Sequence, residues 1–196
     1  VDAFVIADHL RFGRIAKEVY MDDYRYQALR TLTRARFDVI QNLTREKQRF
    51  ANYLFLKCSG IAQDKDIQNT SATTIALMER FETVDDLANA DLEELTSFID
   101  EKGRNFADPA AKAKAIQTAA RDSYRLPITV NNSVNQAMAV SIASMRALER
   151  QVKVLDKAIE HQFEIIPNTL TSIPGIGKVY PAGIIAEIGN IHRFDS

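Results

Sequence analysis

The sequence has 196 residues, of which 46% are hydrophobic and 26% charged, and its formal net charge is −1. It can bury a core, but it lacks the overall positive charge that marks many nucleic-acid-binding proteins. No run of about 18 apolar residues occurs, so no transmembrane helix is expected. The single cysteine, Cys58, excludes an internal disulfide and suits a reducing cytoplasm.

The opening stretch, VDAFVIADHLRFGR, is expected to form a short helix that ends at Gly13. Val5, Ile6 and Leu10 would share one face of this helix. Asp2 comes just before this helix. Its carboxylate either caps the helix by accepting a backbone amide, or binds a metal ion at the edge of a larger site. The residues alone leave both roles open.

A long helix is expected from Asp22 to about Lys57, and residues 21–69 form the first coiled-coil region. A helix of some 35 residues would be about 50 Å long, more than a small compact domain needs. Polar intrusions at Arg36 and Glu46 make its heptad pattern imperfect. The apolar stripe of this helix comprises Leu29, Leu32, Val39, Leu43, Phe50 and Tyr53.

The same helix carries a strong local charge. Seven basic and two acidic residues lie between Arg25 and Arg49, a local net of +5. Such side chains either form a solvated face or contact a nucleic-acid backbone. The candidate contacts are Arg30, Arg34 and Arg45.

After a break at residues 58–69, residues 70–127 are expected to form a small helical insert with clear helix starts. Thr83 with Asp86, and Asp91 with Glu94, have the spacing of a capping box. Asp108 before Pro109 indicates an N-cap followed by proline at the first helical position. The expected core comprises Ile75, Met78, Phe81, Leu87, Leu92, Leu95, Phe98, Ile99 and Ile116.

The insert is acidic where the first long helix is basic. Between Glu79 and Glu101 there are nine acidic residues and one basic residue, a local net of −8. This segregation of charge suggests one face for an anionic partner and another that is kept away from it.

A second long helix is expected at about 134–166, within a second coiled-coil region at residues 128–167. Apolar residues recur every seven positions along it, which is typical of a coiled-coil seam. The two long helices should pack antiparallel, although either could pair with a second copy through residues 138–166 or 29–53. The seam comprises Met138, Met145, Val152, Ile159 and Ile166.

The stretch LTSIPGIGKVYPAGIIAEIG, within residues 168–196, predicts a helix-hairpin-helix. A short helical segment would lead into Pro174-Gly175-Ile176-Gly177, and a second helix would run from Lys178 to about Glu187. The two glycines allow positive φ and close backbone approach. Amides at the start of the second helix can face a phosphate, with Lys178 adding a contact. The alternative is a tight turn between helices that binds nothing.

No catalytic motif can be read in the chain. The three histidines are scattered, Cys58 has no partner at a zinc spacing, and there is no phosphate-binding loop. The sequence begins at Val1 without methionine and stops at Ser196 in mid-pattern, so we interpret it as a piece of a longer protein. Catalysis by this piece alone is not expected.

Two of these motifs resemble DEDD transposases of the insertion-sequence one-hundred-and-ten family, relatives of the Piv DNA invertase. VDAFVIADHLRFGR resembles the end of their RuvC-like catalytic domain, which would occupy residues 1–20 here. IPGIGKVYPAGIIAEIGNIHRFDS resembles the opening of their C-terminal transposase domain, here residues 168–196. The long helices between them resemble the coiled-coil connector of the family.

The resemblance implies a function: movement or inversion of DNA by strand cleavage and rejoining. The family uses four carboxylates and a divalent metal, expected to be magnesium, in the full-length protein. Asp2 matches the fourth carboxylate, but the other three would precede Val1, so no metal is expected on this piece. DNA, a structured guide RNA and further copies of the chain are the implied partners, with no membrane, in a bacterial cytoplasm near the nucleoid.

The sequence therefore predicts an all-α fold with two long antiparallel helices, a small helical insert and a terminal helix-hairpin-helix. Two alternative functions are compatible with this sequence. One is a part of a DNA transposase that binds nucleic acid and oligomerises. The other is a noncatalytic helical module for nucleic-acid binding or assembly, in which the glycine turn is structural.

Overall fold

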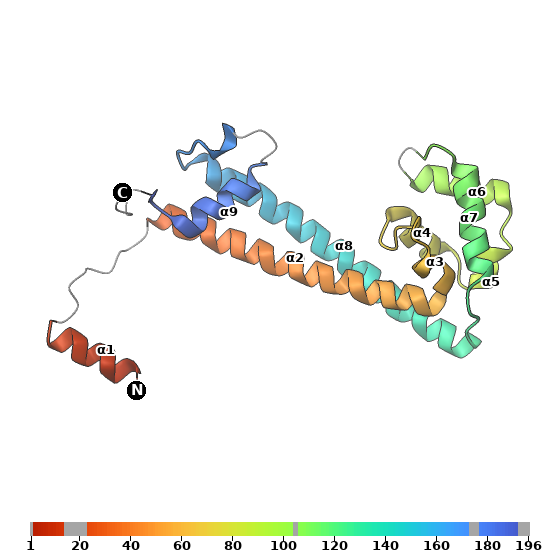
Figure 1. The fold of residues 1–196 in the computed structure, drawn as a ribbon, viewed down its shortest axis with the longest axis horizontal. Coiled ribbons are helices and arrows are strands. Elements are labelled where there is room, and N and C mark those ends of the chain that lie inside the picture. Colours follow the sequence, from red (N-terminus) through yellow and green to blue (C-terminus); the bar gives the residue numbers. More distant parts are fainter. Residues whose placement is uncertain (1, 14–22, 104–105, 173–176, 192–196) are drawn as a thin grey trace. The chain divides into compact units, whose positions relative to one another are not determined.

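The computed structural model describes residues 2–13, 23–103, 106–172 and 177–191, and all regular structure in these ranges is helical (Figure 1). The predicted all-α class is therefore confirmed. The chain divides into two compact units: unit 1 comprises Val1–Ala35 and Leu155–Ser196, and unit 2 comprises Arg36–Val154. None of the described helices is both long and apolar enough to cross a bilayer.

The two predicted long helices are α2 (Tyr24–Lys57) and α8 (Ile128–Glu164). Each contributes residues to both units. Helix α8 begins directly after Pro127, six residues before the expected start at Val134. Proline at this point is compatible with a helix start because its missing amide would have no partner there.

Three helices of the insert in unit 2 begin directly after the predicted capping residues Thr83, Asp91 and Asp108. Thr83 and Asp86 exchange two hydrogen bonds, of 2.9 and 3.1 Å, in a complete capping box. Asp91 and Asp108 each accept a backbone amide at 2.9 Å. The short helices are α3 (Ser59–Gln63), α4 (Ala72–Arg80), α5 (Val84–Ala88), α6 (Leu92–Lys102) and α7 (Pro109–Arg121).

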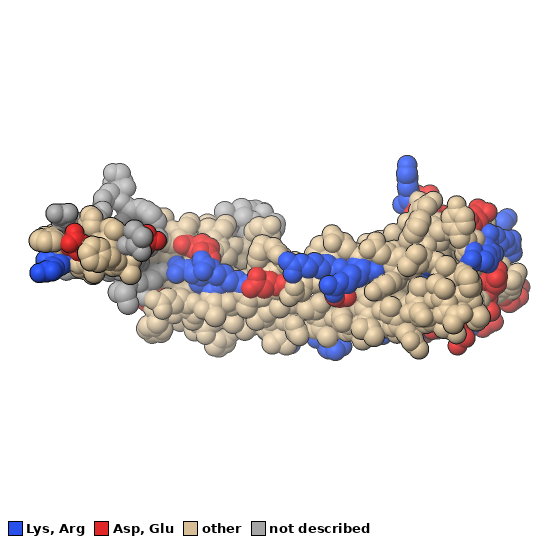
Figure 2. All heavy atoms as spheres, turned by 90° about the horizontal axis from the view of Figure 1, so that it is seen from below, with Lys and Arg blue, Asp and Glu red and all other residues tan. Residues whose placement is uncertain are grey.

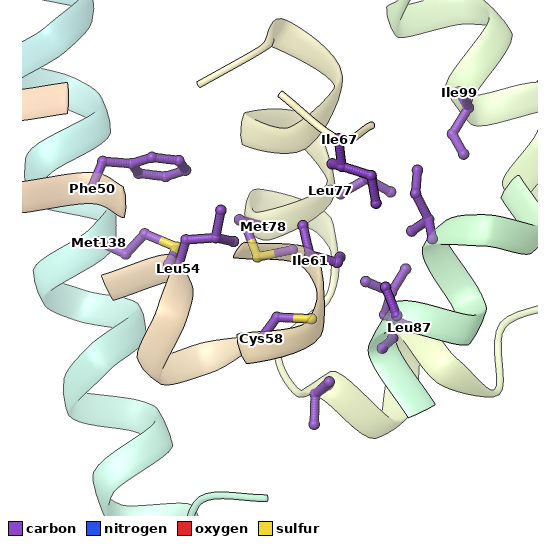
Figure 3. Close-up of a cluster of buried hydrophobic side chains, with 14 of the residues drawn as sticks. Phe50, Leu54, Cys58, Ile61, Ile67, Leu77, Met78, Leu87, Ile99 and Met138 are labelled. Carbon is purple, nitrogen blue, oxygen red and sulfur yellow. The ribbon is translucent and has the colours of Figure 1, made fainter. Parts of the chain in front are cut away.

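The core of unit 2 joins the insert to the two long helices. Helix α7 packs against α3, α5 and α6. Figure 3 shows Phe50 and Leu54 of α2 beside Met138 of α8. Leu92 is 40% exposed, so its assignment to the core was wrong; it is the first residue of α6, ahead of the face buried by Leu95 and Ile99. Other predicted core residues are buried, namely Met78, Leu87 and Ile116.

The expected break at residues 58–69 contains a helix, α3. Gly60 lies so close to α7 that a Cβ there would meet the carbonyl oxygen of Ala119 at 1.9 Å. Its backbone amide donates to Ser123 Oγ at 2.9 Å, and that hydroxyl donates to Ala119 O at 2.8 Å. The glycine that suggested a break in the sequence is instead the contact that lets α3 dock on α7.

Within unit 2, α2 and α8 lie side by side and run in opposite directions (Figure 1). Ser141 Oγ lies 3.3 Å from the carbonyl oxygen of Glu46 and 3.2 Å from its carboxylate. The seam residues Met138 and Met145 are buried in the same cluster as Leu43. The chain itself therefore covers this part of the heptad seam.

Unit 1 includes α1 (Asp2–Arg11), the 3₁₀ turn η1 (Leu170–Ser172) and α9 (Val179–Ile188). The first part of the predicted hairpin is thus a 3₁₀ turn, and its second helix is α9. Pro181 lies buried in the first turn of α9, where proline costs no internal helix bond. The core of this unit comprises Leu29, Ile159, Phe163, Ile166, Ala182 and Ala186.

Candidate nucleic-acid interface

The predicted glycine turn lies mostly outside the described residues, since Pro174, Gly175 and Ile176 fall in the undescribed range 173–176. Gly177 is described, and a Cβ there would meet nothing within 4 Å. Among described glycines, only Gly13 and Gly189 have positive φ, of 61° and 70°. Gly177 therefore does not adopt the positive φ that a glycine at this position allows. Lys178 already has helical dihedrals, so the chain enters α9 without a left-handed residue at Gly177.

The N-terminal end of α9 is accessible. Gly177 and Lys178 are exposed, and Tyr180 is 80% exposed. Lys178 occupies the N-cap position and makes no side-chain cap bond. The first amides of a helix have no partner within it, and they carry a partial positive charge. The Tyr180 amide donates to Gly177 O at 3.3 Å and Pro181 has no amide, so the amides of Lys178 and Val179 remain to favour a phosphate group at this end.

Tyr180 is a candidate contact that the sequence reasoning missed. An exposed aromatic ring beside a phosphate-binding helix end can stack on a base or sugar. The sequence could have indicated this residue, because in VYPAGII only Tyr180 carries a polar group on its side chain.

Lys178 forms an ion pair with Glu164 of α8. Its Nζ donates to Glu164 Oε1 at 2.7 Å, and both side chains are about half exposed, at 48% and 62%. This hydrogen bond raises the pKa of Lys178 and lowers the pKa of Glu164. An ammonium group has three donors, so Lys178 can hold Glu164 and still bind a phosphate.

Arg30 and Arg34, the two predicted phosphate contacts near the start of α2, meet the other end of α9. Arg30 Nε donates to the carbonyl oxygen of Ala186 at 2.7 Å. Arg34 makes a bidentate pair with Glu187, with Nε and Nη2 each 2.9 Å from a carboxylate oxygen. The structure thus brings these arginines to the C-terminal end of α9. Their contact with a phosphate stays a prediction.

The basic residues of α2 in unit 2 also have neighbours within the chain. Arg45 Nη1 donates to Asn42 Oδ1 at 3.1 Å, and Arg49 pairs with Glu46. Lys47 Nζ lies 4.0 Å from a carboxylate oxygen of Glu149. Figure 2 shows basic side chains interspersed with acidic ones on the face in view. The local excess of positive charge is therefore partly neutralised, and Arg45 keeps an uncharged partner.

Asp2 is exposed and is the first residue of α1. An acidic side chain in the first turn interacts favourably with the partial positive charge of the helix N-terminus. In the described part of the chain, no group of three or more His, Cys, Asp or Glu side chains could hold a metal ion. The metal-ligand role of Asp2 therefore stays a prediction.

Comparison with known protein families gave one match at each end of the chain. Residues 1–57 match the DEDD model of the IS110 type, described as a transposase. Residues 168–196 match the model described as Transposase IS116/IS110/IS902 family. No characterised protein and no solved structure gave a significant match.

These two matches cover the α1–α2 region and the region of η1 and α9, where the resemblance was seen in the sequence. They support the interpretation of this chain as part of a DNA transposase that acts in the transposition of mobile elements. At both ends the chain is therefore similar to transposases of the IS110 type.

Proposed function

We propose that this chain binds the backbone of DNA through the N-terminal end of α9, as part of a transposase that cleaves and rejoins DNA strands. The observation that carries the proposal is the exposed start of α9 with Lys178 at its N-cap, inside a segment that matches a transposase model. Backbone amides and one lysine contact phosphates without reading bases. Pro174, Gly175, Ile176 and Gly177 complete the proposed contact segment.

The pair formed by Lys178 and Glu164 gives a sharp test. If Lys178 meets a phosphate, Lys178→Ala should weaken DNA binding and reduce the salt slope by about one. Glu164→Ala should strengthen binding, because it removes a competing carboxylate at 2.7 Å from the lysine. Fluorescence anisotropy with duplex DNA over a series of salt concentrations measures both effects.

Lys157→Ala is the matched control, since Lys157 is an exposed lysine on α8. It should leave the salt slope unchanged. If Lys178→Ala and Lys157→Ala bind DNA as the parent does, Lys178 contacts no phosphate and the proposed interface is wrong. A structured RNA used as a competitor shows whether the same surface prefers RNA, as the family resemblance also allows.

Arg45 is the proposed second contact, on α2 in unit 2. Its partner within the chain, Asn42, is uncharged, so a phosphate would not have to displace a carboxylate. Arg45→Ala should reduce the salt slope by about one, whereas Asn42→Ala should not weaken binding.

Self-association is also part of the proposal, although the seam residues first expected to mediate it are covered. Met138 and Met145 are 1% and 2% exposed, and Leu29 and Phe50 are fully buried. A second copy would therefore have to use other side chains or separate the long helices. Exposed apolar residues on α2 and α8 of unit 2 offer such a surface: Phe37, Phe55, Val140 and Val154. Sedimentation over a range of concentrations tests this, and a monomer throughout would contradict it.

Strand cleavage by a divalent metal is proposed for the full-length transposase only. The described residues do not form a metal site, and Asp2 supplies a single carboxylate. Paired metal ions in such reactions stabilise the attacking and leaving oxygens and need clustered carboxylates. No catalytic step can therefore be assigned to the described part of this chain.

A further inference from the structure

The C-terminal end of α9 is fixed to α2 by two arginines that are more than 150 positions away in the sequence. Arg30 Nε donates to Ala186 O at 2.7 Å, and Arg34 holds Glu187 through two bonds of 2.9 Å. Arg30 Nε also lies 3.9 Å from Glu187 Oε2. All of these contacts lie within unit 1.

The chemistry of a helix end explains why these partners meet. The last carbonyl groups of a helix have no intrahelical donor, and they carry a partial negative charge. Arg30 supplies a charged donor to one of them. Glu187 adds a further negative charge in the same turn, and Arg34 offsets it. The hydrogen bond to Glu187 raises the pKa of Arg34, and the bond to Arg34 lowers the pKa of Glu187.

Packing beneath this end of α9 supports the same placement. Ala182 and Ala186 are fully buried against a cluster that includes Leu29 and Ile159. Small side chains let α9 approach the long helices closely, and Val179 and Ile185 pack against the same cluster, but such apolar contacts are not directional. Gly189, with φ 70°, ends the helix just beyond Glu187. The two arginines therefore supply directional bonds that hold this end.

We infer that Arg30 and Arg34 are positioning residues, which hold α9 so that its N-terminal end is presented to a nucleic-acid backbone. This inference rests on the proposed function of that end. The arginines act through Ala186 and Glu187. Arg34 is less favourably placed than Lys178 to bind a phosphate, because it lies at the C-terminal end of α9, where the partial negative charge of the helix adds to the Glu187 carboxylate in opposing an anion.

The direction in which Glu187→Ala changes the DNA affinity distinguishes a positioning role of Arg34 from direct contact with a phosphate. If Arg34 positions α9, Glu187→Ala should weaken DNA binding about as much as Arg34→Ala does, by roughly three- to tenfold. If Arg34 binds a phosphate, Glu187→Ala should strengthen binding. The salt slope gives a second readout: positioning leaves it unchanged in Arg34→Ala, whereas a lost phosphate contact lowers it by about one.

A double variant that exchanges the charges of Arg34 and Glu187 tests whether a restored ion pair also restores DNA binding. The double variant Arg34→Glu/Glu187→Arg should regain most of the affinity lost by Arg34→Glu alone. Arg25→Ala is the matched control, because the side chain of Arg25 donates its hydrogen bonds to Asp23 at the start of α2. It should bind DNA as the parent does.

Hydrogen exchange of the α9 amides, without DNA, tests the inference independently of the proposed function. Exchange should become faster in Arg34→Ala and in Glu187→Ala, and it should stay unchanged in Arg25→Ala. Unchanged exchange in the first two variants, or tighter DNA binding by Glu187→Ala, would overturn the inference. If the parent chain binds no DNA, the proposed function fails, while faster exchange still supports the role of the arginines in holding α9.

Discussion

Substitution of Gly60 by alanine should disrupt the docking of α3 on α7. A Cβ at Gly60 would lie 1.9 Å from the carbonyl oxygen of Ala119 and 2.8 Å from its carbonyl carbon. Both atoms belong to the backbone of α7, so no side-chain rotation can remove the overlap. The helices must move apart, which also stretches the 2.9 Å bond from the Gly60 amide to Ser123 Oγ.

The expected loss of stability follows from these two effects. Overpacking in a core costs about 1–3 kcal/mol, and a lost hydrogen bond costs about 0.5–1.5 kcal/mol. Gly60→Ala should therefore lower the free energy of unfolding by roughly 1.5–4.5 kcal/mol, and the melting temperature by about 3–18 °C. Urea and thermal unfolding, followed by far-UV circular dichroism, measure both quantities.

Gly183→Ala is the control for the effect of adding a methyl group to a glycine. Gly183 lies inside α9, and a Cβ there would meet nothing within 4 Å. Alanine is favoured over glycine in a helix by about 0.5–1 kcal/mol, so this change should be neutral or stabilising. If the free energy of unfolding of Gly60→Ala lies within about 0.5 kcal/mol of that of the parent, the predicted backbone overlap is wrong.

Three further predictions concern the pH dependence, capping and activity of the chain. Burial lowers the pKa of Lys57 to about 8, below about 10.4 for an exposed lysine, so the unfolded state binds the proton more tightly. The free energy of unfolding should therefore rise between about pH 8 and pH 10. The rise in the parent should exceed the rise in Lys57→Met by up to about 3 kcal/mol. Urea titrations at each pH measure it. Thr83→Ala should cost about 1 kcal/mol by removing a cap, whereas Thr118→Ala, at an exposed site on α7, should stay within about 0.5 kcal/mol. The purified chain should not cleave DNA with magnesium, and cleavage abolished by Asp2→Ala would contradict this.

Helix starts were predictable because their chemistry is local. Thr83 and Asp86 are three residues apart, and each supplies the acceptor that the amide of the other needs. Asp108 and Pro109 fix the start of α7 in the same way. The two long helices were also readable, since their apolar residues recur regularly and no proline interrupts them.

Features that depend on distant partners were not predictable. Gly60 lies in a helix rather than a break, and its role is to leave room for the backbone of Ala119 of α7, which is 59 positions away in the sequence. Arg34 was read as a free cation, since Glu187 lies 153 positions further along the chain. For Gly177, the sequence showed that a positive φ is permitted, but not whether the backbone adopts it.

The two ends of α9 show why cations of similar appearance should have different roles. Arg30 and Arg34 lie at the C-terminal end, where the partial charge of the helix is negative, and they satisfy a carbonyl group and a carboxylate there. Lys178 lies at the N-terminal end, where the partial charge is positive and a cation is disfavoured unless an anion is near. Glu164 supplies an anion, and a phosphate bound to the helix amides would supply a second. The helix dipole therefore favours a phosphate at Lys178 and opposes one at Arg34, so removal of Glu164 and removal of Glu187 should change DNA affinity in opposite directions.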